Sequence, residues 1–403
     1  MIMEIVFMTG EPIAMTSVTL FGAIGDSIHD DSAALQRALD ADESHLYIPA
    51  GKYRIHGMLT LRSHTTLTLH PEAYMLLDDH TGSDQNPYLL TCEPGATDIT
   101  VDGGVWEGNC EQNPRDLGEH PYRGILLSFS DATHLTLRNM TLRNSEAFHI
   151  RLNYVTDFLI EHITFDDTII RFTQDGIHLG GGCERGIIRH IHAVGASSPN
   201  DDLISLCADY VGENMAPTDP IWGQRPGPIR DIEMYDVTAD NTFSFLRIFS
   251  HREPIERVYA HHFSGGCYYL ALQMEITPYL RNRFEDYPPE TVYGTGQIRD
   301  VRIEDWRVHM KLPYGTHMGD YFINHVGGVI DIEQSITGLS IRRFERDLSR
   351  DAKPDRLPTL TLRNFKVNHI ALSPDKAATH ITPGYTPYTL SGSIPYLDLT
   401  TDM

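Results

Sequence analysis

The chain has 403 residues, of which 41% are hydrophobic and 22% are charged, a composition that supports a packed core and excludes a disordered protein. Its 32 basic and 55 acidic side chains give a formal net charge of −23, and a field of this sign repels phosphates and anionic lipids. We therefore expect neither nucleic acid nor a membrane as a partner, and the sequence leaves the oligomeric state open.

The first 45 residues are expected to form an N-terminal segment and a cap. Met1–Met15 contain Glu4 and Glu11 but neither Lys nor Arg, so the positive region of a secretory signal is missing and we expect a cytoplasmic protein. A short amphipathic helix is predicted directly after Asp30-Asp31-Ser32, which provides an N-cap. Its apolar residues are Ala33, Ala34, Leu35, Ala38 and Leu39.

The cysteines favour free thiols. Their number is odd, they are widely spaced and no Cys-x-x-Cys pair occurs, so we expect buried thiols in a reducing compartment and no disulfide frame or zinc site. They are Cys92, Cys110, Cys183, Cys207 and Cys267. We predict no metal site and no cofactor.

From about Leu46 onward, short β-branched or apolar strands alternate with turns rich in Gly, Asn, Asp and Pro, which is typical of an all-β protein. Five of these strands can be stacked in register, which places Leu152, Leu179, Leu206, Ile248 and Met274 in one column. The successive spacings are 27, 27, 42 and 26 residues, so one coil carries a long insertion. A second series of strands agrees with the repeat: His134–Asn139, Phe158–His162, Gly186–His190, Ile229–Glu233 and Ile298–Arg302.

A constant period near 27 residues predicts a right-handed parallel β-helix, a solenoid whose inward side chains stack coil on coil. A β-sandwich or propeller also contains many short strands, but its turns would not return the same column in every coil. We therefore expect a single domain over residues 1–403. Residues 46–375 form its coils, 208–228 a loop insertion and 376–403 a C-terminal tail.

The residues before this apolar column should point outward, because strand side chains alternate between the two faces. This outward polar ladder consists of Arg151, His178, Ser205, Arg247 and Gln273. In the same register Asp175 and Asp202 begin adjacent strands, and Asp201 comes one residue earlier. Adjacent strands lie about 4.8 Å apart, so these carboxylates should share one small region.

Clustered carboxylates point to glycoside hydrolysis. Like charges raise the pKa of at least one member, so one carboxyl group stays protonated and donates to the leaving oxygen while an ionised one activates water. Aspartates between strands also cap turns, and for a single Asp that interpretation would be preferred.

The run Phe21-Gly22-Ala23-Ile24-Gly25-Asp26, with Asp30-Asp31-Ser32 and Ala38 after it, resembles an N-terminal signature shared by pectin-degrading β-helix enzymes and many phage tail proteins. Pro49–Tyr53, Leu61–Leu67 and Gly104–Asn109 are similar to the polygalacturonase family, family 28 of the glycoside hydrolases. The resemblance runs from about Phe21 to Gln273.

The family's Asn-Thr-Asp-Gly element is matched by Thr173-Gln174-Asp175-Gly176, and its Asp-Asp pair by Asn200-Asp201-Asp202. The resemblance implies that Asp201 is the general acid, that Asp175 and Asp202 hold and deprotonate the water, and that the anomeric configuration is inverted.

Two elements of the family are changed. Thr242-Phe243-Ser244 stands where the family has Gly-His-Gly, and Arg247-Ile248-Phe249 is a reduced form of its Arg-Ile-Lys. The family's basic pair is associated with galacturonate recognition, so the resemblance implies retained hydrolytic carboxylates with an altered substrate.

Candidate substrate contacts come from the ladder and the loops. Arg151 and Arg247 could bind a sugar carboxylate or neutralise the aspartates, and His149 and His178 could replace the missing histidine or be structural. Gln273 and Glu275 extend the ladder. The insertion holds Trp222, with Tyr210 and Arg225, as an aromatic platform or a loop anchor, and Tyr279–Tyr293 could form another wall.

The sequence thus predicts an exo-acting, inverting glycoside hydrolase with a plant-type or pectic oligosaccharide as substrate. One alternative is a calcium-dependent polysaccharide lyase, in which the three aspartates bind Ca²⁺ and Arg247 abstracts the proton α to a uronate carboxyl group. Another is a β-helix that binds glycans without catalysis.

Overall fold

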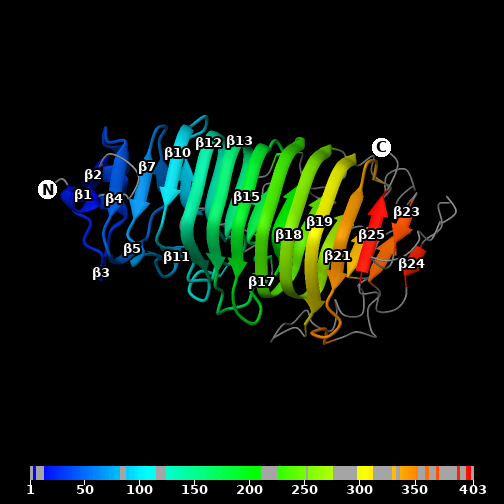
Figure 1. Cartoon of the computed structure of the whole chain (residues 1–403). Coiled ribbons are helices and arrows are strands. Elements are labelled where there is room, and N and C mark those ends of the chain that lie inside the picture. Colours follow the sequence, from blue (N-terminus) through cyan, green and yellow to red (C-terminus); the bar gives the residue numbers. More distant parts are fainter. Residues whose placement is uncertain are drawn as a thin grey trace, which may run out of the picture.

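The computed structural model describes residues 3–5, 13–81, 88–114, 124–171, 173–209, 225–250, 253–275, 297–311, 329–332, 336–352, 359–362, 369–371, 388–390 and 396–400. In these ranges the chain is almost entirely β-structure, and its coils advance along one axis from the N-terminus to the C-terminus (Figure 1). The protein is a right-handed parallel β-helix with a short N-terminal helix, as the sequence predicts.

One face of the β-helix, called sheet 1, contains the predicted apolar column. Its strands are β6 (Leu59–Leu61), β9 (Tyr88–Cys92), the starts of β12 (Ile125–Arg143) and β13 (Ile150–Phe165), β14 (Ile177–Leu179), β16 (Asp202–Cys207), the ends of β17 (Ile229–Phe249) and β18 (Ile255–Glu275), β20 (Ile330–Ile332) and β22 (Leu360–Leu362). They pair in parallel, and Leu152, Leu179, Leu206, Ile248 and Met274 follow one another as register partners. The predicted register is confirmed.

The long strands β12, β13, β17 and β18 continue round the corner onto two further faces (Figure 1). The strands that complete these faces are β4 (His45–Ile48), β7 (Thr66–Leu69), β10 (Thr97–Asp102), β15 (Glu184–Ala193), β19 (Ile298–Met310) and β21 (Ser340–Arg346), and β3 (Asp26–Asp30), β5 (Gly51–Ile55), β8 (Ala73–Leu77) and β11 (Val105–Glu107). The second predicted series of strands lies here, but the sequence missed one member. The strand that starts at Ile255 lies between those that start at Ile229 and Ile298.

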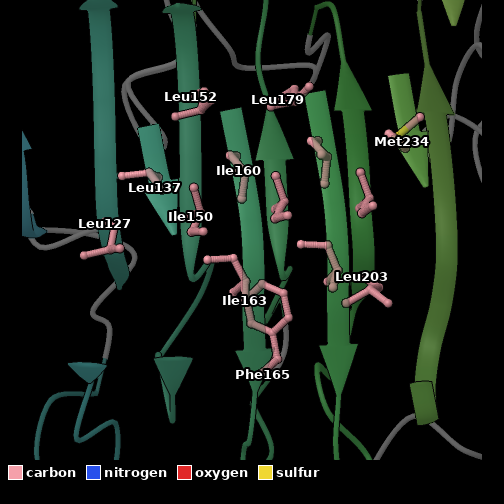
Figure 2. Close-up of a cluster of buried hydrophobic side chains, with 14 of the residues drawn as sticks. Leu127, Leu137, Ile150, Leu152, Ile160, Ile163, Phe165, Leu179, Leu203 and Met234 are labelled. Carbon is pink, nitrogen blue, oxygen red and sulfur yellow. The ribbon is translucent and has the colours of Figure 1, made fainter. Parts of the chain in front are cut away.

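The inward side chains form one continuous apolar core. Leu127, Ile150 and Leu152 come from sheet 1, and Ile160 and Ile163 come from the later part of β13, on the faces that follow (Figure 2). These side chains are completely buried, which follows from the alternation of faces along each strand. The core therefore fixes which side chains point outward from sheet 1.

The N-terminal end is closed by the predicted helix, α1 (Ser32–Asp40), which packs on β6 and on the short 3-10 helix η1 (Val18–Phe21). Its buried residues are Ala34, Leu35, Ala38 and Leu39, while Ala33 is exposed. Asp31 precedes the helix but does not cap it with its side chain. Its carboxylate accepts hydrogen bonds from the backbone N–H groups of Ile24 (2.7 Å) and Gly25 (3.1 Å), which ties the run 21–26 to the helix start.

Both ends of the described chain contain antiparallel pairs. β1 (Met3–Ile5) pairs with β2 (Ile13–Ser17), which continues in parallel to β4. At the other end, β24 (Tyr388–Leu390) pairs antiparallel with β22, and β25 (Tyr396–Thr400) pairs with β21 and with β23 (His369–Ala371). The predicted tail therefore contains strands that fold back on the last coils.

All five cysteines lie in the described ranges, and they are buried with free thiols, as expected. No helix in the part of the chain that the structure describes has the length and apolarity needed to span a membrane.

Candidate active site

The three predicted aspartates lie together at the edge of sheet 1. Ile177 and Ile204 are register partners, and the N–H of Gly176 donates to the carbonyl of Asp202, so Asp175 and Asp202 begin neighbouring rungs. One carboxylate oxygen from each of Asp175, Asp201 and Asp202 lies within 4.8 Å of the other two. Carboxylates 27 positions apart in sequence therefore lie close together in space.

The close packing of neighbouring rungs requires a glycine directly after Asp175, at Gly176. A Cβ on Gly176 would lie 2.5 Å from the carbonyl oxygen of Leu203 and 3.0 Å from the ring of Phe165. Any side chain here would push the two rungs apart, and the carboxylates with them.

The electrostatics of the cluster favour protonated acids. Burial raises the pKa of Asp175 well above its usual range, the charge of Asp202 raises it further, and Arg247 opposes the rise. Burial likewise raises the pKa of Asp201, and both neighbouring aspartates add to this rise. Two neighbouring carboxyl groups that resist ionisation are typical of a site for acid–base chemistry.

Asp202 is held by the next rung of sheet 1. Its register partner is Ser244, whose hydroxyl donates a short hydrogen bond to Oδ1 of Asp202. Nη1 of Arg247 lies 3.6 Å from Oδ2 of the same carboxylate. Ser244 belongs to the run Thr242-Phe243-Ser244, which stands in place of the family's Gly-His-Gly. The sequence assigned no role to this run, so the contact of Ser244 with Asp202 was missed.

The outward polar ladder is confirmed, and it is longer than predicted. Arg151, His178, Ser205, Arg247 and Gln273 are successive register partners. Ser128 precedes them and Asp331 follows them. Of the predicted substrate contacts among them, Arg151, His178 and Gln273 are buried, at most 6% exposed, whereas the side chain of Arg247 beside the aspartates is 12% exposed.

His149 lies behind the cluster and not in it. Its side chain is fully buried, with Nδ1 2.9 Å from the backbone oxygen of Asp175 and Nε2 2.9 Å from Oδ1 of Asp167. Burial alone would lower the pKa of His149, but Asp167 outweighs it and the pKa is raised. Both ring nitrogens face oxygen acceptors, which is the environment of a doubly protonated ring. Both ring nitrogens of His149 are thus engaged within the protein.

Arg151 is engaged within the protein. Its guanidinium donates to the hydroxyl of Ser130 (2.6 Å) and lies 5.6 Å from the ring centroid of Tyr88. Gln273 lies between Arg247 and Asp331 in the ladder.

An aromatic cluster continues the line of the aspartates. Phe243 occupies the position of Asp201 one rung further on, and its ring stacks on Tyr269 with centroids 4.4 Å apart. Tyr268 packs edge-on to Phe243, and its hydroxyl is hydrogen-bonded to Asn200 and to Ser197. This cluster stands where the resemblance would place a histidine, and it ties the segment before Asp201 to β18.

The remaining predicted contacts lie in or beside the loops. Trp222, Tyr210 and Tyr279–Tyr293 are outside the described residues, and of Glu275 only the backbone is described. The end of the insertion is described. Arg225 exchanges backbone hydrogen bonds with the side-chain amide of Asn153 and forms a short ion pair with Asp131.

Comparisons with known proteins agree with this fold. Residues 15–181 match the family model described as rhamnogalacturonase A/epimerase, pectate lyase-like. Among similar solved structures, an exopolygalacturonase from Thermotoga maritima has a TM-score of 0.54 at 13% identity and covers 97% of each chain. A family 28 exopolygalacturonase from Yersinia enterocolitica has a TM-score of 0.52 at 16% identity, over 82% of this chain and 77% of that one.

Two curated relatives match shorter stretches. Plasmin and fibronectin-binding protein A of Streptococcus pneumoniae is 30% identical over 154 residues, which are 33% of this chain and 21% of that protein. Mannuronan C5-epimerase AlgE5 of Azotobacter vinelandii is 34% identical over 102 residues, 21% of this chain and 10% of the epimerase. The chain therefore matches only about a fifth and a tenth of their lengths. The chain as a whole thus has the fold of a right-handed parallel β-helix, and its residues 15–181 match a pectate lyase-like family model.

Proposed function

We propose that the protein is a glycoside hydrolase that uses Asp175, Asp201 and Asp202. The observation that carries the proposal is the contact of three carboxyl groups within 4.8 Å, with the pKa of Asp201 raised by burial and by its two neighbours. An acid that keeps its proton beside an ionisable partner is what the hydrolysis of a glycosidic bond requires.

In this proposal Asp201 donates its proton to the glycosidic oxygen as the bond from that oxygen to the anomeric carbon breaks. A water molecule held between Asp175 and Asp202 attacks the anomeric carbon, and one of these two carboxylates accepts the proton that the water loses. The products are two sugars that have together gained one water. Because the water attacks directly, the anomeric configuration inverts. The short separation of the carboxylates would by itself favour retention, so the stereochemistry must be measured.

The proposed substrate is a plant-type or pectic oligosaccharide, cleaved from one end of the chain. Support comes from two similar structures that are named exopolygalacturonases. The substitution of Thr242-Phe243-Ser244 for the family's Gly-His-Gly argues for a sugar other than galacturonate next to the cleaved bond.

The test is a panel of pectic and other plant-derived oligosaccharides, with products resolved by chromatography and the first-formed anomer read by NMR. We expect the wild type to release product from at least one substrate with inversion, and Asp201→Asn to lose this activity. Undiminished turnover by Asp201→Asn, or retention of configuration, would contradict the proposal.

A second candidate is chemistry at the carbon next to a uronate carboxyl group, as in a lyase or an epimerase. The cluster itself favours it, because three carboxylates in contact are suitable ligands for Ca²⁺ and Arg247 lies beside them. A curated relative is named a mannuronan C5-epimerase. Loss of activity in EDTA, with either an unsaturated product that absorbs in the ultraviolet or a changed C5 configuration, would favour this candidate over hydrolysis.

Glycan binding without catalysis is the third possibility, and a curated relative is named for binding two proteins. Burying three adjacent carboxyl groups costs stability, and a binding surface gains nothing from it. Saturable glycan binding with no product on any member of the panel would favour this possibility.

A further inference from the structure

His178 contacts a proposed catalytic carboxylate directly. Its Nδ1 lies 2.6 Å from Oδ2 of Asp175, three residues earlier, and both side chains are at most 5% exposed. A contact of this length requires one proton between nitrogen and oxygen, and on whichever atom it resides, the hydrogen bond fixes the direction of the carboxyl group.

Phe148 fixes the plane of the His178 ring. The two rings are parallel within 6° and their centroids are 4.1 Å apart. Phe148 precedes Ile150 by two residues, and Asp175 precedes Ile177, the register partner of Ile150, by two, so Phe148 occupies the position of Asp175 one rung earlier. A ring stacked in this way keeps Nδ1 directed at Asp175.

The neighbours of His178 in the ladder supply no competing carboxylate. Arg151 is its register partner on one side and Ser205 on the other. Besides Arg151, charged groups near the pair are Asp202, which raises the pKa of Asp175, Arg247, which lowers it, and Asp201, which lies within 4.8 Å of Asp175. The carboxylate that is hydrogen-bonded to the His178 ring is that of Asp175.

We infer that His178 is a positioning residue that orients the carboxyl group of Asp175 and is itself aligned by Phe148. The inference rests on the proposed function for its catalytic consequence. It replaces the expectation that His178 contacts the substrate, since its Nδ1 is directed at Asp175. His178 acts through Asp175 and touches no reacting atom.

A matched pair of amides tests the inference. The side-chain nitrogen of Asn lies near the position of Nδ1, whereas that of Gln lies near Nε2, so only His178→Asn keeps a donor for Asp175. We expect His178→Gln to lower kcat about 10²-fold, the effect of a misplaced catalytic group, with KM nearly unchanged and the acidic limb of the pH–rate profile shifted. His178→Asn should retain most of kcat, and Phe148→Leu should lie between the two.

The control is His192→Phe. His192 is an exposed histidine of β15 outside sheet 1, hydrogen-bonded to Thr238, and its substitution should leave kcat and KM at wild-type values. Raised KM with unchanged kcat in both His178 variants would instead indicate a substrate contact. Equal kcat for the Asn and Gln variants would overturn the inference.

A measurement without substrate separates this inference from the proposed function. In folded protein carrying ¹⁵N-labelled histidine, the Nδ1 resonance of His178, identified by its loss in His178→Asn, should shift when Asp175 becomes Asn. If the resonance shifts but the wild-type protein hydrolyses no sugar, the proposed function is contradicted and the Asp175–His178 coupling is supported. An unchanged resonance would refute the coupling even if the enzyme hydrolyses sugars.

Discussion

Two columns of charged side chains run along this β-helix, and their electrostatics are opposite. On the outer corner, acids and bases alternate from rung to rung, as in the ion pairs of Arg185 with Asp157 (2.7 Å) and Arg257 with Asp231 (2.6 Å). Hydrogen bonds from the arginines hold the pKa of both aspartates below its usual range. At the edge of sheet 1, three aspartates from two neighbouring rungs lie within 4.8 Å of one another, and the pKa of Asp175 and Asp201 is raised.

The same rung spacing therefore produces two outcomes. In the corner column each acid pairs with a base and both side chains are partly exposed. This column should contribute little to stability, because exposed ion pairs are weak. At the edge of sheet 1 the aspartates have other aspartates as neighbours and little contact with water. This arrangement is electrostatically unfavourable, and packing of the coils alone does not require it. Such a contrast within one molecule marks a functional site.

The largest difference between the two columns is expected when the proposed general acid, Asp201, is removed. Asp201→Asn should lower kcat by about 10²–10⁴-fold, the usual contribution of a general acid, while the fold is retained. Asp231→Asn in the corner column is the matched control and should leave turnover unchanged. The measurement is initial rate on the best oligosaccharide of the panel, and equal losses in both variants would remove the distinction between the columns.

The buried ion pair behind the cluster should dominate stability. His149→Phe leaves Asp167 buried without its cation, and we expect the free energy of unfolding to fall by about 3–5 kcal/mol. The pKa of His149 is raised in the folded state, so its contribution is fully present below the unfolded value of about 6.5 and disappears as the pH rises through the folded value. Urea unfolding at pH 6 and pH 9 measures this.

For that experiment the control is Asp157→Asn, which removes an exposed acid and should show no such pH dependence. A His149→Phe protein with wild-type stability at pH 6 would show that the buried pair is not a stabilising element.

The cluster itself should destabilise the fold at neutral pH. A carboxyl group whose pKa is raised on folding destabilises the protein above its unfolded pKa of about 3.9, and this cost is absent at lower pH. Asp201→Asn should therefore raise the free energy of unfolding at pH 7 by about 0.5–2 kcal/mol, with the gain vanishing near pH 4. Thermal unfolding at the two pH values is the measurement, and a loss of stability at pH 7 would contradict it.

The smallest effect is expected in the corner column. Asp157→Asn breaks the exposed pair with Arg185 and should lower the free energy of unfolding only slightly at low salt and still less at high salt. Chemical unfolding at two salt concentrations checks this. A salt-independent cost of several kcal/mol would mean that the corner ladders hold the coils together.

Much of the fold could be predicted because a β-helix repeats. A constant spacing places Leu152, Leu179 and Leu206 in one column without knowledge of any contact, and alternation then places Arg151, His178 and Ser205 on the opposite face. The strand at Ile255 was missed although its run Ile-Glu-Arg-Val has the same apolar spacing as the run Ile-Arg-Asp-Val that starts at Ile298.

The site was predicted in outline. Periodicity brought Asp175 and Asp202 together, since both begin strands in the same register. It did not reveal the contact of Ser244 with Asp202, or the stacking of Phe148 on His178, because these depend on side-chain directions between rungs.

The sequence by itself determined the coil length, the column that faces the core and the rungs that bring the three aspartates together, because strand alternation and a fixed period are local properties of the chain. Only the tertiary structure decided that His149 lies buried against Asp167 while His178 is directed at Asp175. His149 directly precedes β13 and His178 lies within β14, and packing between neighbouring coils sets which of them meets a carboxylate of the cluster and which supports it from behind.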